Sequence, residues 1–138
     1  TRRQSREEAL QIIFQLDHTP DLSVEKAALQ FQENFKKQNV DEFALRLVSG
    51  VREHQAEIDK RIEEVSKHWK TYRMESVDRN ILRLGVFELC YCTDIPSTVT
   101  INEWIEIAKG FGTESSASFI NGILDKVKST HPLAGKAP

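Results

Sequence analysis

Cysteine is scarce in this 138-residue sequence, and the two that occur, Cys90 and Cys92, lie only two positions apart. On a helix they would point roughly 200° away from each other, so a disulfide between them is geometrically poor. We interpret both as reduced core thiols. Reduced cysteines are typical of a cytoplasmic protein.

Long hydrophobic runs are absent as well. The sequence has no apolar stretch of 18 residues and no amino-terminal apolar segment of the signal-peptide kind. Secretion and membrane spanning are therefore not expected. We expect a cytoplasmic protein with no membrane partner.

Motifs for metal or cofactor chemistry are also missing. The four histidines lie in different segments, with no HExxH, no paired CxxC and no glycine-rich phosphate loop. No metal site or cofactor is therefore expected. Glu103 and Glu106 share a helix face and could form an acid/base pair, but a solvated face is the favoured interpretation. The sequence gives no support for an enzyme.

Net charge is small, at -2 with a pI near 6.1, which argues against a protein that coats nucleic acid through bulk charge. The distribution is uneven. Residues 1–6 contain Arg2, Arg3 and Arg6 and no acid, whereas the remaining chain has 16 basic and 21 acidic residues. The positive charge is therefore local to the amino-terminal end.

The segment Val77 to Tyr91 is apolar on every side of a helical wheel, which predicts a core helix covered by neighbours all round. Arg83 and Glu88 lie inside it, so each must reach the rim of the core or find a partner. The remaining periodicity predicts an all-α protein of seven helices in one domain over 1–130. The helices are expected at 3–18, 23–37, 41–54, 56–70, 77–91, 98–109 and 113–129, followed by a loose tail over 131–138.

The three arginines continue the apolar face of the first helix past the edge of the core. Side chains that point inward but carry positive charge must lie where the bundle ends. There they either belong to a frayed arm or are covered by an anionic partner. A guanidinium is planar, permanently charged and suited to phosphate. Binding of RNA by Arg2, Arg3 and Arg6 and a merely solvated terminus both stay open at this point.

Phe119 and Asp78 are two further candidates. Phe119 lies about 80° from the axis of the apolar stripe of its helix, so it belongs to the core flank or forms a base-stacking platform. Asp78 falls in a first helical turn, where it favours the helix dipole or belongs to a polar partner surface.

Several strings resemble the family of the bacterial transcription antitermination factor NusB. They are RQSREEALQIIFQ (3–15), DRNILRL (78–84), FEL (87–89), DIP (94–96), INE (101–103), EIAK (106–109), FG (111–112) and FINGILDK (119–126). The resemblance spans nearly the whole chain, although residues 20–70 match only in helical pattern. It implies two packed helical subbundles.

The resemblance also implies a function. The family binds boxA RNA together with a ribosomal protein, NusE, so that elongating RNA polymerase ignores terminators. It would place RNA contacts on Arg2, Arg3, Arg6 and Phe119, and contacts to the ribosomal protein on Asp78 and Phe14. We expect the arginines and Phe119 to gather at one end of the molecule and to grip single-stranded RNA there.

Three departures from the family pattern stand out. Gly85-Val86-Phe87 replaces a familiar alanine, variable residue and tyrosine, Phe14 replaces a frequent tyrosine, and Trp104 occupies a usually small position. A ring at 104 needs a pocket or a second subunit, and some members resemble homodimers. Two alternatives remain: an accessory domain of a ribosomal RNA methyltransferase, or a helical scaffold that binds no RNA.

Overall fold

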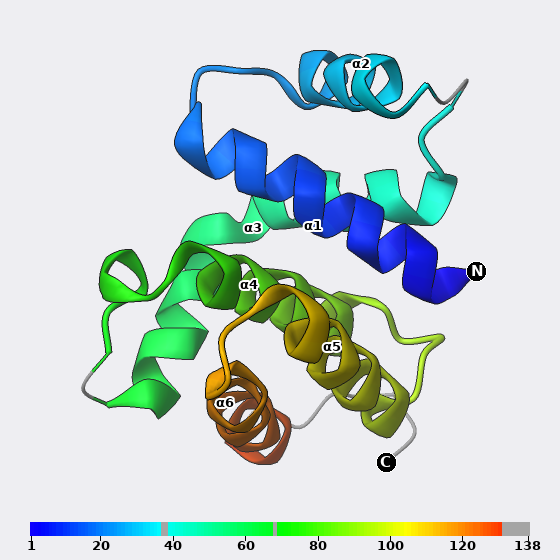
Figure 1. The fold of residues 1–138 in the computed structure, drawn as a ribbon. Helices are drawn as coiled ribbons and strands as arrows, with labels where there is room; N and C mark the ends of the chain where they lie inside the picture. The colour runs from blue at the N-terminus through cyan, green and yellow to red at the C-terminus, as the bar shows by residue number, and fades with distance from the viewer. Residues whose placement is uncertain (37–38, 68, 131–138) are drawn as a thin grey trace.

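The computed structural model describes residues 1–36, 39–67 and 69–130 (Figure 1). Within these ranges there are six α-helices, one 3-10 helix and no strand. They are α1 (Arg2–His18), α2 (Val24–Phe35), α3 (Glu42–Ser66), η1 (Thr71–Arg73), α4 (Ser76–Tyr91), α5 (Ser97–Phe111) and α6 (Ser116–Thr130). The all-α prediction is confirmed and the count of seven helices is wrong. The tail expected over 131–138 lies outside the described residues.

The miscount comes from α3, where two helices were expected and a single kinked one is present. Only His54 leaves helical geometry, with φ -109° and ψ 16°, and the helix resumes directly after it. Neither glycine nor proline stands at this point to stop the helix. The whole of α3 therefore acts as one kinked element that packs with α1, α2, α4 and α6 (Figure 1).

Side chains cap the helices that begin the fold. Thr1 and Gln4 form a capping box, in which the Gln4 backbone N–H donates to the Thr1 hydroxyl at 3.2 Å. Ser23 caps α2, accepting from the Lys26 N–H at 3.1 Å. Lys36 ends α2 in a left-handed conformation, with φ 53°. The arginines of the first turn are consequently held in helical geometry and do not form a frayed arm.

Helix α4 is the buried centre of the protein, as predicted. Every residue from Asn80 to Leu89 is buried, and α1, α3, α5 and α6 all pack against this helix (Figure 1). Both internal charges, Arg83 and Glu88, stay inside the core and find carboxylate or guanidinium partners there. No helix of the described chain is long and apolar enough to cross a bilayer.

Two glycines set how closely the helices approach α4. A Cβ on Gly50 of α3 would lie 2.1 Å from the ring of Phe87, so the absence of a side chain makes room for that ring. On the other side, a Cβ on Gly85 would lie 3.1 Å from Leu124 and 3.5 Å from Trp104. Trp104 is fully buried within its own chain. Its ring therefore has a pocket without a second subunit, and the homodimer stays a prediction.

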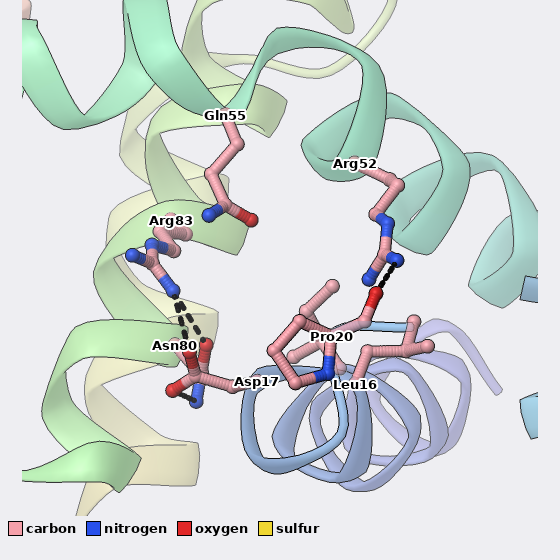
Figure 2. Close-up of a pocket in the computed structure, with 8 residues that line it drawn as sticks. Leu16, Asp17, Pro20, Arg52, Gln55, Asn80 and Arg83 are labelled. Atoms are coloured by element: carbon pink, nitrogen blue, oxygen red, sulfur yellow. Dashed lines mark hydrogen bonds and ion pairs between the residues drawn. The ribbon is translucent and has the colours of Figure 1, made fainter. Parts of the chain in front are cut away.

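Asp17 joins α1 to α4 (Figure 2). Its Oδ2 accepts from Arg79 at 2.6 Å and from Asn80 at 3.1 Å, and its Oδ1 accepts from Arg83 at 3.2 Å. Arg83 also makes a two-pronged pair with Asp59 of α3, at 2.8 and 2.9 Å. Burial alone would raise the pKa of Asp17, but the hydrogen bonds from Arg79 and Asn80 and the nearby guanidinium charges lower it overall.

The lowered pKa of Asp17 predicts an acid-sensitive contribution to stability. A carboxylate with a depressed folded pKa stabilises the protein above its ordinary pKa of about 4, and this stabilisation is lost as the pH falls through the folded pKa. Asp17→Asn should therefore lower the free energy of unfolding at pH 7 by about 1–2 kcal/mol. The variant should also lose less stability than the parent on acidification, as measured by urea unfolding at pH 7 and below pH 4.

The same change at exposed Asp21 is the matched control, since it alters charge without touching this junction. If the stability profiles of the parent and Asp17→Asn run parallel down to acidic pH, Asp17 is not the group responsible.

Candidate functional site

The three arginines of α1 have three different environments. Arg2 is exposed, with its guanidinium carbon 4.1 Å from the centroid of the Phe43 ring, a cation–π contact. Arg3 is half-exposed and donates to both carboxylate oxygens of Glu103, from Nε at 3.2 Å and from Nη2 at 2.6 Å. These two side chains can be reached from solvent.

Arg6 is inside the protein, with only 2% of its side chain exposed. It donates from Nε and Nη2 to the two oxygens of Glu88, at 2.9 and 2.8 Å. Glu88 is fully buried and also accepts from Thr100 and, at 3.0 Å, from Trp104 Nε1. The expectation that Arg6 lies past the edge of the core is therefore wrong. Its inward direction was predicted, but its anionic partner is a carboxylate of its own chain.

Carboxylates reduce the positive charge of this end further. Arg2 and Arg6 line a pocket of about 320 Å³ together with Asp94 and Glu103. Asp94 is also 3.4 Å from Arg46. The local surplus of positive charge is thus smaller than the first six residues suggest, and Arg2 and Arg3 are the arginines placed to meet a phosphate.

Phe119, near the start of α6, is half-buried. Its ring meets Trp69 edge to face, with centroids 6.0 Å apart and planes at 75°. Trp69 is 50% exposed and Tyr72 is 71% exposed, with the Arg73 guanidinium carbon 5.7 Å from the Tyr72 ring centroid. The phenyl ring lies on the core flank, as one of the two interpretations had it, and exposed aromatics stand beside it.

Sequence reasoning missed this aromatic group. The signal was present in the string WKTYR at 69–73, where two aromatics and an arginine stand among polar residues at and beyond the end of the helix expected over 56–70. Such a pattern is poorly explained by a core.

Asp78 lines the same pocket as Phe119 and Trp69, which has a volume of about 400 Å³. The Asp78 side chain is almost completely buried, at 8% exposure. Its Oδ1 has no hydrogen-bond partner among the described residues. A buried acceptor left unpaired is costly, so this oxygen is suited to a donor that arrives with a partner.

Phe14 lies in a neighbouring apolar pocket of about 360 Å³. Phe35, Val77 and Phe111 line that pocket too, and Val77 directly precedes Asp78, so the two pockets adjoin. Phe14 is 37% exposed and Phe35 is 55% exposed. Both lie at the rim of the core, because α2 covers only part of α1.

The arginines and Phe119 are far apart, so the expectation that they gather at one end is wrong. The pocket of Arg2 includes Asp94, beyond the end of α4, whereas the pocket of Phe119 includes Asp78, in its first turn. The 16 residues of α4 separate the two by about 24 Å. The reason is α5, which begins beside Arg2 and carries the chain to the opposite end before α6 starts (Figure 1).

In the part of the chain that the structure describes, no three or more His, Cys, Asp or Glu side chains are grouped so as to hold a metal ion. The chemistry available at both ends is therefore that of guanidinium, carboxylate and aromatic groups. Such groups bind and position a ligand through charge, hydrogen bonds and stacking.

Comparison with known proteins identifies the family. The model of the NusB family matches residues 3–129. The transcription antitermination protein NusB of Desulforamulus reducens is 50% identical over 129 residues, which cover 91% of this chain and 88% of that protein. The NusB structure from T. maritima superposes with a TM-score of 0.85 at 37% identity, covering 95% of this chain and 92% of that one.

A second similar structure contains partners. It is described as the antitermination factors NusB and NusE in complex with double-stranded RNA, and it matches with a TM-score of 0.83 at 27% identity. The match covers 94% of this chain and 97% of that one. Fold, sequence identity and coverage agree, and the chain belongs to the NusB family.

Proposed function

We propose that this protein is a noncatalytic, cytoplasmic transcription antitermination factor. It binds single-stranded boxA RNA together with the ribosomal protein NusE, and so allows the elongating RNA polymerase to pass terminators in ribosomal RNA operons. The observation that carries this proposal is the match over nearly the whole chain to a related NusB that is bound to NusE and RNA.

The geometry suggests how the RNA runs. Arg2 and Arg3 meet phosphates at one end of the bundle, and Phe119 and Trp69 offer aromatic faces to unstacked bases at the other. A strand that reaches both must extend about 24 Å along the molecule, the length of α4. Arg6 is a positioning residue that does not touch the RNA. Its ion pair with Glu88 fixes the first turns of α1, which carry Arg2 and Arg3, against α4.

NusE is proposed to cover the pocket of Phe14 and the Asp78 side of the adjoining pocket, while the Phe119 and Trp69 side of that adjoining pocket stays open to RNA. The exposed phenylalanines supply apolar surface, and the unpaired Oδ1 of Asp78 supplies a buried acceptor for a cationic or amide donor. Burying that acceptor against a donor would stabilise the complex more than a rim contact does.

A titration tests the proposed function directly. Labelled single-stranded boxA RNA, a scrambled strand of the same length and a duplex are each mixed with the protein, with and without NusE. We expect the boxA strand to bind more tightly than the scrambled strand and the duplex, and NusE to strengthen that binding. A protein that binds NusE but shows no preference for boxA RNA in either arm would be the scaffold of the alternative interpretation.

Phe119→Asp should weaken binding of boxA RNA by about 5- to 150-fold, because stacking of a base on an aromatic ring contributes about 1–3 kcal/mol. The ring is half-buried at the core flank, so the variant should keep its helical circular dichroism spectrum and remain folded. Binding is measured by fluorescence anisotropy, and folding by thermal melting of the same samples.

Leu29→Asp is the matched control, because it places the same charge on an exposed apolar side chain of α2 that is distant from both proposed RNA contacts. Equal losses of RNA affinity in the two variants would mean that added negative charge, and not the lost ring, is responsible.

A further inference from the structure

Glu103 on α5 binds Arg3, one of the two arginines of α1 that solvent can reach. Both Glu103 oxygens accept from Arg3, at 2.6 and 3.2 Å, and Oε1 also lies 3.5 Å from Nη1 of Arg6. The hydrogen bond from Arg3 lowers the pKa of Glu103, and burial opposes this only in part. The carboxylate is consequently ionised at neutral pH and is held by two guanidinium groups.

A carboxylate and an RNA phosphate make the same demand on a guanidinium. Each offers two oxygens to the two parallel N–H donors of the arginine fork. In the free protein Glu103 already takes that fork of Arg3 through Nε and Nη2. A phosphate that approaches Arg3 from solvent must therefore displace Glu103 or share the arginine with it.

Glu103 does not depend on Arg3 alone for its position. Arg6 is held in the interior by its ion pair with Glu88. Its remaining guanidinium nitrogen, Nη1, lies 3.5 Å from Oε1 of Glu103. When Arg3 turns to another ligand, Glu103 therefore remains beside it and attracts it back. The Glu103 carboxylate therefore competes with any other anion for the Arg3 guanidinium.

We propose that Glu103 is an autoinhibitory residue that competes with RNA phosphate for Arg3 and so sets the RNA affinity of the free protein below what its arginines would allow. This inference rests on the proposed RNA-binding function. It concerns how that site is regulated, and it assigns Glu103 a role opposite to that of an RNA-contacting residue.

Glu106 provides a matched control one turn further along α5. It is exposed, carries the same charge and pairs with Lys109 at 2.6 Å, and it makes no hydrogen bond to Arg3 among the described residues. Glu103→Gln and Glu106→Gln therefore remove one negative charge each from the same helix, but only the first removes the partner of Arg3.

The test measures affinity for labelled single-stranded boxA RNA at about 0.15 M salt, where the Debye length of about 8 Å screens charges that are not in contact. Glu103→Gln should bind about 2- to 5-fold more tightly than the parent, the range that an exposed ion pair allows. The slope of log K against log salt should change by less than about 0.7, the value for one phosphate contact, because Arg3 meets the same phosphate in the parent and in the variant. Glu106→Gln should stay within about 1.5-fold of the parent, because its charge is screened.

Arg3→Gln serves as the background that isolates the contact. In that background Glu103→Gln should increase the affinity for boxA RNA no more than Glu106→Gln does, because Arg3, the arginine that Glu103 holds, is absent. Melting curves of all variants should stay close to that of the parent, because Arg6 keeps Glu88.

Two failures are distinguishable. If the parent binds no boxA RNA with or without NusE, the proposed function fails. If the parent binds but Glu103→Gln equals Glu106→Gln, or binds more weakly than the parent, the competitor role is overturned while RNA binding stands.

Discussion

Arg6→Met should lower the free energy of unfolding by about 3–5 kcal/mol, the cost of leaving a buried charge without its partner. Glu88 is fully buried, and loss of Arg6 would remove the two-pronged guanidinium partner of its charge while the neutral donors of Thr100 and Trp104 remain. Guanidinium chloride unfolding at pH 7, followed by circular dichroism, measures the change.

Two companion variants define this effect. Arg3→Met removes a half-exposed pair and should cost far less stability than Arg6→Met does. Adding Glu88→Gln to Arg6→Met should recover much of the loss, because the charge disappears while the amide oxygen still accepts from Trp104. If Arg6→Met is as stable as the parent and loses only RNA affinity, Arg6 is a direct RNA contact and the positioning role is wrong.

Gly50→Ala should destabilise the protein by about 3 kcal/mol, although alanine is the better helix former by about 1 kcal/mol. The new Cβ would lie 2.1 Å from the Phe87 ring, and that ring is stacked on Tyr91 at 5.2 Å between centroids. Neither α3 nor the ring can move without disturbing α4. Chemical unfolding gives the magnitude.

Gly122→Ala should change the free energy of unfolding in the opposite direction. Nothing lies within 4 Å of a Cβ at this helical position, so the substitution should stabilise by about 0.5–1 kcal/mol. In a Phe87→Ala background, Gly50→Ala should no longer destabilise, because the space is vacated. Destabilisation that persists there would locate the clash in the backbone of α4.

Much of the fold follows from local pattern. The apolar circumference of 77–91 predicted a buried centre, and α4 is buried from Asn80 to Leu89. Ser23 was recognisable as an N-cap because capping depends on a residue and its third neighbour. The sequence predicts an interruption near His54, where α3 has its kink. It predicts two separate helices there, because sequence alone does not show whether a helix resumes after one irregular residue.

The site was less predictable, because its geometry depends on residues far apart in the chain. Arg6 and Glu88 are 82 positions apart, and no spacing rule connects them. Helical periodicity gave the inward direction of Arg6 but not what it would meet there. Similarly, the placement of Phe119 about 24 Å from Arg2 depends on the direction in which α5 crosses the bundle, which periodicity leaves undetermined.

The packing around Gly85 has an evolutionary consequence. A methyl group at position 85 would meet the Trp104 ring at an ordinary 3.5 Å but would lie only 3.1 Å from Leu124. The tryptophan is therefore compatible with either glycine or alanine at 85, and the tight neighbour is the leucine on α6. Among descendants, position 85 is expected to covary with position 124 and to vary independently of position 104.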